Sequence, residues 1–154
     1  MWLELLDGAK SVSVLLTVIA ALTAVYVGYL TYKLNTENLK ERLFDKRIKV
    51  YEDVHLGLSM ILRDAEFTDA SLNTLVNASQ RARFLFGPEI HSFIKEIISQ
   101  GSKMRMYQEN LRDEPIGPKR SELVDKEHVH LKWLTDEIFS FSEKFDKYLL
   151  FGTR

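Results

Sequence analysis

The chain has 154 residues, with 21 Lys and Arg, 22 Asp and Glu, and a formal net charge of -1 at pH 7. That length allows one modest domain, and the near-neutral charge argues against a nucleic-acid partner. The sequence has no Cys, which excludes disulfides, thiolate metal sites and cysteine nucleophiles.

A run without any charged residue, SVSVLLTVIAALTAVYVGYLTY, occupies residues 11–32. At about 1.5 Å per residue, a helix of this length crosses the roughly 30 Å hydrocarbon core of a bilayer. Tyr26, Tyr29 and Tyr32 crowd its C-terminal end, where aromatic rings favour the membrane interface. The sequence therefore predicts a transmembrane helix, after a short extracytoplasmic or interfacial N-terminus at residues 1–10.

Two alternatives compete with a retained anchor. A buried helix of a soluble protein seldom runs this long without a charge. A cleaved signal peptide needs a basic N-terminal region and small residues before the cleavage site. Here Glu4 and Asp7 oppose Lys10, and cleavage after Ala24 would place Leu22 at the third position back. Both alternatives fit the sequence less well than an anchor.

Charges on either side of the run predict its orientation. Only Lys10 precedes it, whereas basic residues follow it closely at Lys33, Lys40, Arg42, Lys46, Arg47 and Lys49. Because positive charge is retained on the cytoplasmic side, we expect an inner-membrane protein with its N-terminus outside and residues 33–154 in the cytoplasm. The basic residues then either contact anionic lipid headgroups or form a solvated helix face.

One face of the run is small, with Thr17, Ala20, Ala24, Gly28 and Thr31 spaced three or four apart. Small residues let two helix backbones approach closely in a bilayer. A homodimer held through the span is one interpretation. The other is the ordinary small-residue content of membrane helices.

The part of the chain after the run carries helical patterns and almost no strand signal. Short connections between such helices favour antiparallel neighbours. The predicted fold is therefore all-α, an N-terminal transmembrane helix followed by an antiparallel up-down bundle of about four helices. The expected helices occupy residues 33–63, 70–86, 88–112 and 121–150.

Local signals mark several of these boundaries and faces. Asp69 is the expected N-cap of the second helix, and Gly87-Pro88 separates the second helix from the third. His55 lies on the inward stripe of the first helix, as a buried pH-sensitive group or as a satisfied core histidine. Val124 and His128 are expected on the inward stripe of the last helix.

Two E-x-x-H pairs are the only chemical pattern of note, Glu52 with His55 and Glu127 with His130. Helical bundles build carboxylate-bridged di-metal sites from two such pairs and two further Glu residues. The expected helix at 70–86 has no Asp or Glu, so a bridging carboxylate is missing. The sequence also has no Gly-rich phosphate loop and no G-x-S-x-G elbow. We therefore expect no metal, no cofactor and no catalytic residue, and the sequence identifies no small-molecule substrate.

Two segments carry a resemblance, FDKRIKVYE at residues 44–52 and FLFGPEI at residues 84–90. They resemble a set of uncharacterised small bacterial single-span membrane proteins with a helical cytoplasmic domain. The resemblance implies a bacterial inner-membrane location and brings no activity or ligand.

The preferred hypothesis is a non-enzymatic, membrane-anchored interaction or regulatory module, whose partners are the bilayer and either another protein or itself. The alternatives are a membrane-associated stress or phage-defence effector or sensor that oligomerises through its span, and a carboxylate-bridged di-metal protein.

Overall fold

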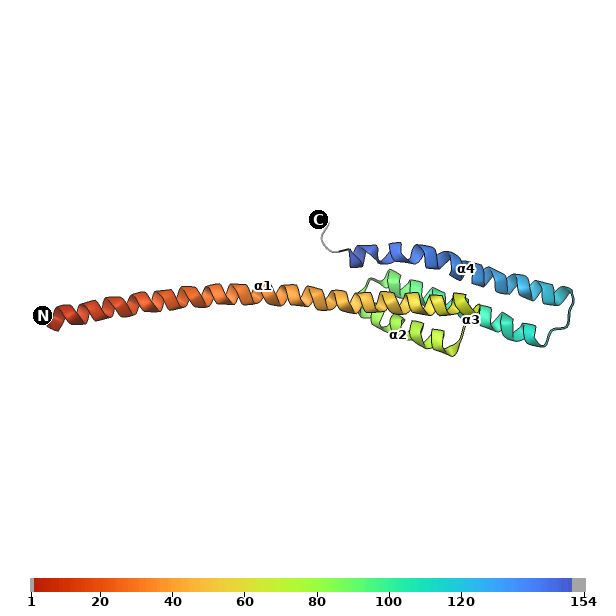
Figure 1. Cartoon of the computed structure of the whole chain (residues 1–154), viewed down its shortest axis with the longest axis horizontal. Coiled ribbons are helices and arrows are strands. Elements are labelled where there is room, and N and C mark those ends of the chain that lie inside the picture. The colour runs from red at the N-terminus through yellow and green to blue at the C-terminus, as the bar shows by residue number, and fades with distance from the viewer. Residues whose placement is uncertain (1, 151–154) are drawn as a thin grey trace. The chain divides into compact units, whose positions relative to one another are not determined.

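The computed structural model describes the backbone of residues 2–150 and the side chains of residues 16–150. Those residues form four helices and no strand, which confirms the predicted all-helical class (Figure 1). The helices are α1 (Trp2–Asp64), α2 (Asp69–Leu85), α3 (Pro88–Arg112) and α4 (Pro118–Leu149). The chain divides into two compact units, Met1–Arg42 and Leu43–Arg154.

The expected helices at residues 11–32 and 33–63 are one continuous helix, α1. No proline interrupts it, because all three prolines lie beyond residue 64. Its end is marked by Ala65, which has a φ of 48°. The Glu66 amide then bonds the Ile61 carbonyl oxygen at 3.3 Å, closing the last turn in the manner of a left-handed C-cap.

The first unit contains the apolar part of α1. Among the described residues, α1 is the one helix long and apolar enough to cross a membrane, and it lies near the N-terminus. Its apolar window has a mean hydropathy of 1.3, and none of that window is buried. The predicted apolar helix is therefore present, and its side chains from Leu16 onward are almost all exposed.

The start of α2 corrects one prediction. Thr68, not Asp69, is the N-cap: Thr68 has an extended backbone, and its side-chain oxygen accepts the Ser71 amide at 3.2 Å. Asp69 is already helical, and its carboxylate pairs with Arg105 of α3 at 2.6 Å. Two residues suited to capping stand side by side here, and the extended backbone of the first decides between them.

Proline sets the starts of α3 and α4. Helix α3 begins at Pro88 after Gly87 and ends at Arg112, as predicted. Helix α4 begins at Pro118 after Gly117, so the predicted start at Ser121 is wrong by one turn. Proline is favoured in the first turn because its φ already suits a helix and it has no amide hydrogen to leave unpaired.

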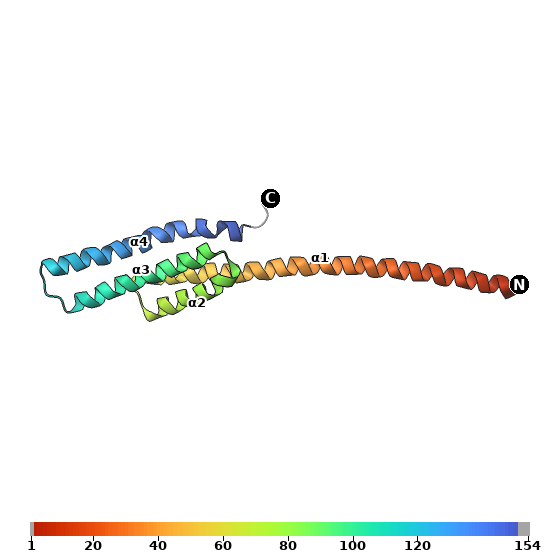
Figure 2. The same ribbon diagram turned by 180° about the vertical axis from the view of Figure 1, so that it is seen from behind.

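In the second unit, α3 lies beside both α2 and α4 (Figures 1 and 2). The last turns of α1 join them through one apolar core. Its buried side chains are Val50, Val54, Leu58, Ile61, Phe67, Leu75, Ala78, Ala82, Phe86, Ile90, Ile94, Ile97, Met104, Leu134, Phe141 and Phe145.

Three residues expected on inward stripes are exposed instead: His55, Val124 and His128. The buried face of α1 runs through Val50, Val54 and Leu58, which leaves His55 at its edge against the Phe141 ring at 5.6 Å. The buried residues of α4 all lie at or beyond Leu134, so its first turns are more exposed.

Candidate functional site

Two threonine side chains in the apolar segment of α1 bond to their own helix. The hydroxyl of Thr31 donates to the Val27 carbonyl oxygen at 2.8 Å, and Thr23 bonds the Ile19 carbonyl in the same way. Such a bond to the preceding turn gives each of these two hydroxyls a partner within its own helix. In hydrocarbon a polar group needs an internal partner, so these two side chains suit a lipid environment.

All five residues of the predicted small-residue face are exposed in the first unit. It comprises Thr17, Ala20, Ala24, Gly28 and Thr31. A methyl group added at Gly28 would meet no atom within 4 Å. The face is therefore open, and its use in self-association stays a prediction.

The predicted basic residues fall into different environments. Lys33, Lys40 and Arg42 are exposed in the first unit. In the second unit Lys49 pairs with Asp53 at 3.2 Å. Arg47 is half-buried and bonds to carbonyl groups of the domain, a role that the sequence did not reveal.

Arg47 belongs to a group of polar and aromatic residues that we call the clasp: Arg47, Phe86, Gly87, Glu89, Lys147 and Tyr148. The Arg47 Nε donates to the Leu85 carbonyl oxygen at 2.9 Å and its Nη1 to that of Tyr148 at 3.3 Å. Its guanidinium also lies 5.3 Å from the Tyr148 ring centroid. These contacts join α1 to the ends of α2 and α4.

The other half of the clasp holds the turn between α2 and α3. The Tyr148 hydroxyl accepts the Gly87 amide at 2.8 Å and donates to Glu89 Oε1 at 2.6 Å. Lys147 also pairs with Glu89. The Lys147 and Tyr148 hydrogen bonds lower the pKa of Glu89 to about 2. These charge-assisted hydrogen bonds join the end of α4, the last described helix, to the start of α3.

The four E-x-x-H residues make separate contacts. Glu52 lies 4.0 Å from Lys49, and His55 rests on Phe141. Glu127 accepts a hydrogen bond from Gln108 at 2.8 Å.

His130 lies 2.5 Å from Gln100 Oε1 and stacks on the Tyr107 ring. Burial and then the charge of Lys103 lower the pKa of His130. Among the described residues, no three His, Asp or Glu side chains gather as a metal site would require.

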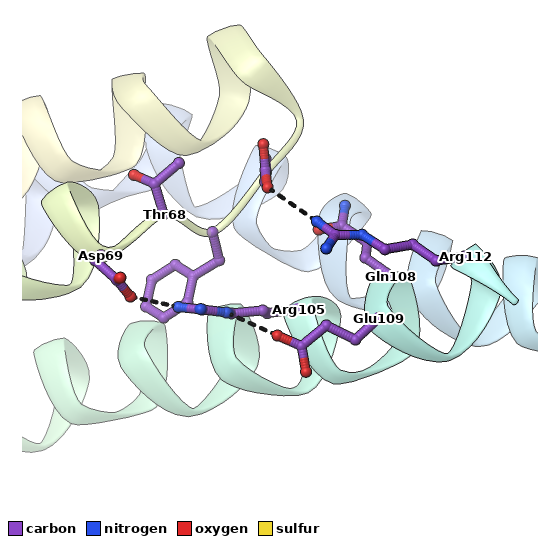
Figure 3. A pocket seen from close by; sticks show the side chains of 8 residues that line it. Thr68, Asp69, Arg105, Gln108, Glu109 and Arg112 are labelled. Carbon is purple, nitrogen blue, oxygen red and sulfur yellow. Dashed lines mark hydrogen bonds and ion pairs between the residues drawn. The ribbon is translucent and has the colours of Figure 1, made fainter.

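A polar pocket of about 260 Å³ opens where the α1–α2 connection meets α3 (Figure 3). Its lining residues are Glu66, Phe67, Thr68, Asp69, Arg105, Gln108, Glu109 and Arg112. Arg105 reaches between Asp69 at 2.6 Å and Glu109 at 3.1 Å (Figure 3). Both carboxylates raise the pKa of Arg105, Asp69 the more. The charged side chains of this pocket pair with one another, and the Asp69–Arg105 pair holds the start of α2 against α3.

A second depression, of about 360 Å³, has an apolar floor. We call it the Phe84 groove, and its lining residues are Lys46, Lys49, Arg81, Phe84 and Leu85. Phe84 is 84% exposed, although the buried Ala82 and Phe86 lie only two residues from it on either side. Sequence periodicity could not identify the groove, because it needs side chains from both α1 and α2.

No family model, no curated protein and no solved structure matches the chain. The resemblance to small bacterial membrane proteins therefore stays a prediction, and the functional argument depends on the geometry.

Proposed function

We propose that the chain is a single-span membrane protein, whose helical domain is an antiparallel up-down bundle that acts as a non-enzymatic interaction or regulatory module. The observation that carries the proposal is the exposed apolar segment of α1, with a mean hydropathy of 1.3 and no buried residue in its apolar window. A soluble core helix of such composition would bury most of that surface.

The flanking charges support one orientation and one compartment. Lys33, Lys40 and Arg42 follow the apolar segment within the first unit and are exposed. Positive charge on that side favours a cytoplasmic domain and a short N-terminus outside an inner membrane.

Exposed aromatic side chains support interaction as the role of the domain. Phe84 on α2 is 84% exposed and Phe139 on α4 is 79% exposed. Aromatic side chains are enriched at protein contacts, and Phe84 stands beside the apolar floor of the Phe84 groove. The charged side chains of the polar pocket, by contrast, are already paired within the domain.

Crosslinking in native membranes tests the proposal. The full-length protein is treated with a lysine-reactive crosslinker, and crosslinked peptides are identified by mass spectrometry. We expect reproducible links from the domain to another polypeptide chain, either a partner or a second copy. The absence of any such link, or turnover of a metabolite by the purified protein, would contradict an interaction module.

A second candidate function, a stress or phage-defence effector or sensor that oligomerises through its span, is favoured by the open face at Gly28. The double variant Ala24→Ile, Gly28→Ile should then lose crosslinked oligomers and any toxicity on overexpression. Unchanged oligomers and toxicity would exclude it.

A further inference from the structure

The Phe84 groove carries unpaired positive charge around an apolar floor. Arg81 pairs with Asp53 at 2.9 Å. Lys49 lies 3.2 Å from Asp53 and 4.0 Å from Glu52, so two carboxylates offset these two cations. Lys46 has no ion pair among the described residues, and the Arg83 guanidinium lies only over the Phe84 ring, at 6.0 Å. An occupant of this groove should therefore present an apolar side chain flanked by carboxylates.

Helix α4 presents such a surface on the same chain. Phe139 is 79% exposed, and Asp136, Glu143 and Asp146 stand three, four and seven residues from it on one helix face. Asp136 pairs with Lys132 at 2.7 Å. Glu143 and Asp146 have no ion pair among the described residues. We call this surface the Phe139 face.

One molecule cannot join its own groove to its own face. Helices α2 and α4 lie on opposite sides of the second unit in both views (Figures 1 and 2). Each of them contacts α3, and α3 lies between them in the contact pattern. The groove and the face can therefore meet each other only between two different copies.

We propose that the Phe84 groove of one copy binds the Phe139 face of a second copy. Phe139 enters the apolar floor beside Phe84, while Glu143 and Asp146 meet Lys46 and Arg83. Aromatic side chains at the centre of a contact, ringed by opposite charges, are the arrangement that gives protein interfaces affinity and orientation.

This contact is head-to-tail, because different surfaces of the two copies meet. Such contacts form rings when they close and open chains when they do not. The inference rests on the proposed membrane anchor, which would hold all copies with their domains on one side of the bilayer. The expected product is a cluster of domains at the membrane surface.

Disulfide trapping tests the contact, since the chain has no Cys of its own. One full-length population carries Gln80→Cys on α2 and another carries Ser142→Cys on α4, each near one of the two surfaces. In phosphatidylcholine vesicles the mixed population should form a disulfide dimer on oxidation. If each population forms dimers alone as readily as the mixture, the contact is not head-to-tail and the proposal fails.

Substitutions identify the residues responsible. Phe84→Ser and Phe139→Ser should each lower the mixed-dimer yield by about tenfold, as loss of a central aromatic side chain does in protein interfaces. Ile116→Ser is the matched control, because Ile116 is 98% exposed and lies in the α3–α4 connection. An equal loss with the control would indicate general adhesion and overturn the proposal.

A charge swap gives the sharpest outcome. Lys46→Glu in the groove and Glu143→Lys on the face should each lower the yield several-fold, and combining them on opposite copies should restore it. Lys103→Glu and Asp125→Lys, exposed charges elsewhere, should leave the yield unchanged. Failure of the swap to restore the dimer would overturn the pairing.

Native-membrane crosslinks from other surfaces of the domain, combined with no effect of the Phe84 and Phe139 variants, would remove this inference and leave the proposed function intact. The membrane surface is the other possible occupant of the groove. A fluorophore attached at Phe84→Cys would then become buried in vesicles that contain anionic lipid and stay exposed in those that do not. That result would overturn the proposed contact between copies.

Discussion

Glu89 illustrates how a single exposed carboxylate can secure the end of a helix. It accepts a hydrogen bond from Tyr148 at 2.6 Å and pairs with Lys147. Both partners belong to the last turn of α4, while Glu89 lies in the first turn of α3. The N-terminus of α3 also favours a negative charge at this position.

The lowered pKa of Glu89 predicts a pH dependence of stability. The folded-state pKa is about 2, below the value near 4.3 of an unfolded Glu. The stabilisation is therefore complete above about pH 4.3 and disappears as the pH falls toward 2. Urea unfolding of the protein in detergent micelles should show this loss, and Glu89→Gln should reduce it. An identical acid profile for the variant would exclude the clasp as its source.

Ala65 predicts a stabilising substitution. Its φ of 48° is unfavourable for a residue with a β-carbon, and glycine adopts it freely. Ala65→Gly should raise the free energy of unfolding by about 0.5–1 kcal/mol, measured by urea denaturation. Ala70→Gly in the first turn of α2 is the control and should lower it. A loss of stability with Ala65→Gly would contradict a left-handed conformation at residue 65.

At the scale of elements, close approach through glycine fixes how the helices pack. A β-carbon at Gly101 would lie 2.5 Å from the ring of Phe67, which comes from the α1–α2 connection and is 1% exposed. At Gly57 it would lie 2.7 Å from Leu75 of α2. The absence of a side chain at Gly101 lets Phe67 pack closely against α3, and its absence at Gly57 lets α2 pack closely against α1.

Gly101→Ala therefore has two opposing effects. Alanine improves helix propensity by up to about 1 kcal/mol, but forcing a methyl group against a buried ring costs about 1–3 kcal/mol. We expect a net loss of thermal stability in the second unit. Gly28→Ala, where no neighbour lies within 4 Å, should leave that transition unchanged. Equal melting temperatures for Gly101→Ala and the unaltered protein would contradict the packing.

The elements were predictable where local chemistry decides them. Gly87-Pro88 ends one helix and starts the next, and both bounds of α3 followed from the sequence. The cap at Thr68 did not follow, since Asp69 is equally suitable as a residue type. His55 was predicted to face inward and is exposed. Periodicity identifies the apolar side of a helix, but it does not show how far the neighbouring helices cover that side. Arg47 bonds to Leu85 and Tyr148, and Phe84 shares its groove with Lys46 and Lys49. These partners are distant in sequence, so a local sequence pattern could not predict the contacts.

For the whole molecule, two surfaces remain to be covered. One is the apolar segment of α1, in which the Thr23 and Thr31 hydroxyls bond to their own helix. The other is the pair of exposed aromatic side chains, Phe84 and Phe139, on opposite helices of the domain. A bilayer would cover the first and a second copy the second, so anchoring and clustering are linked predictions.

Cysteine accessibility tests the membrane anchor most directly. Three variants of the Cys-free chain each carry one cysteine, at Leu22, Ala9 or Ser102. Each variant is produced in a bacterial host and treated with a membrane-impermeant thiol reagent, first in intact cells and then after the membranes are opened. We predict that Ala9→Cys reacts in intact cells, that Ser102→Cys reacts only after opening, and that Leu22→Cys reacts in neither case. Equal labelling of all three after opening, with recovery of the protein in the soluble fraction, would contradict a membrane-spanning α1.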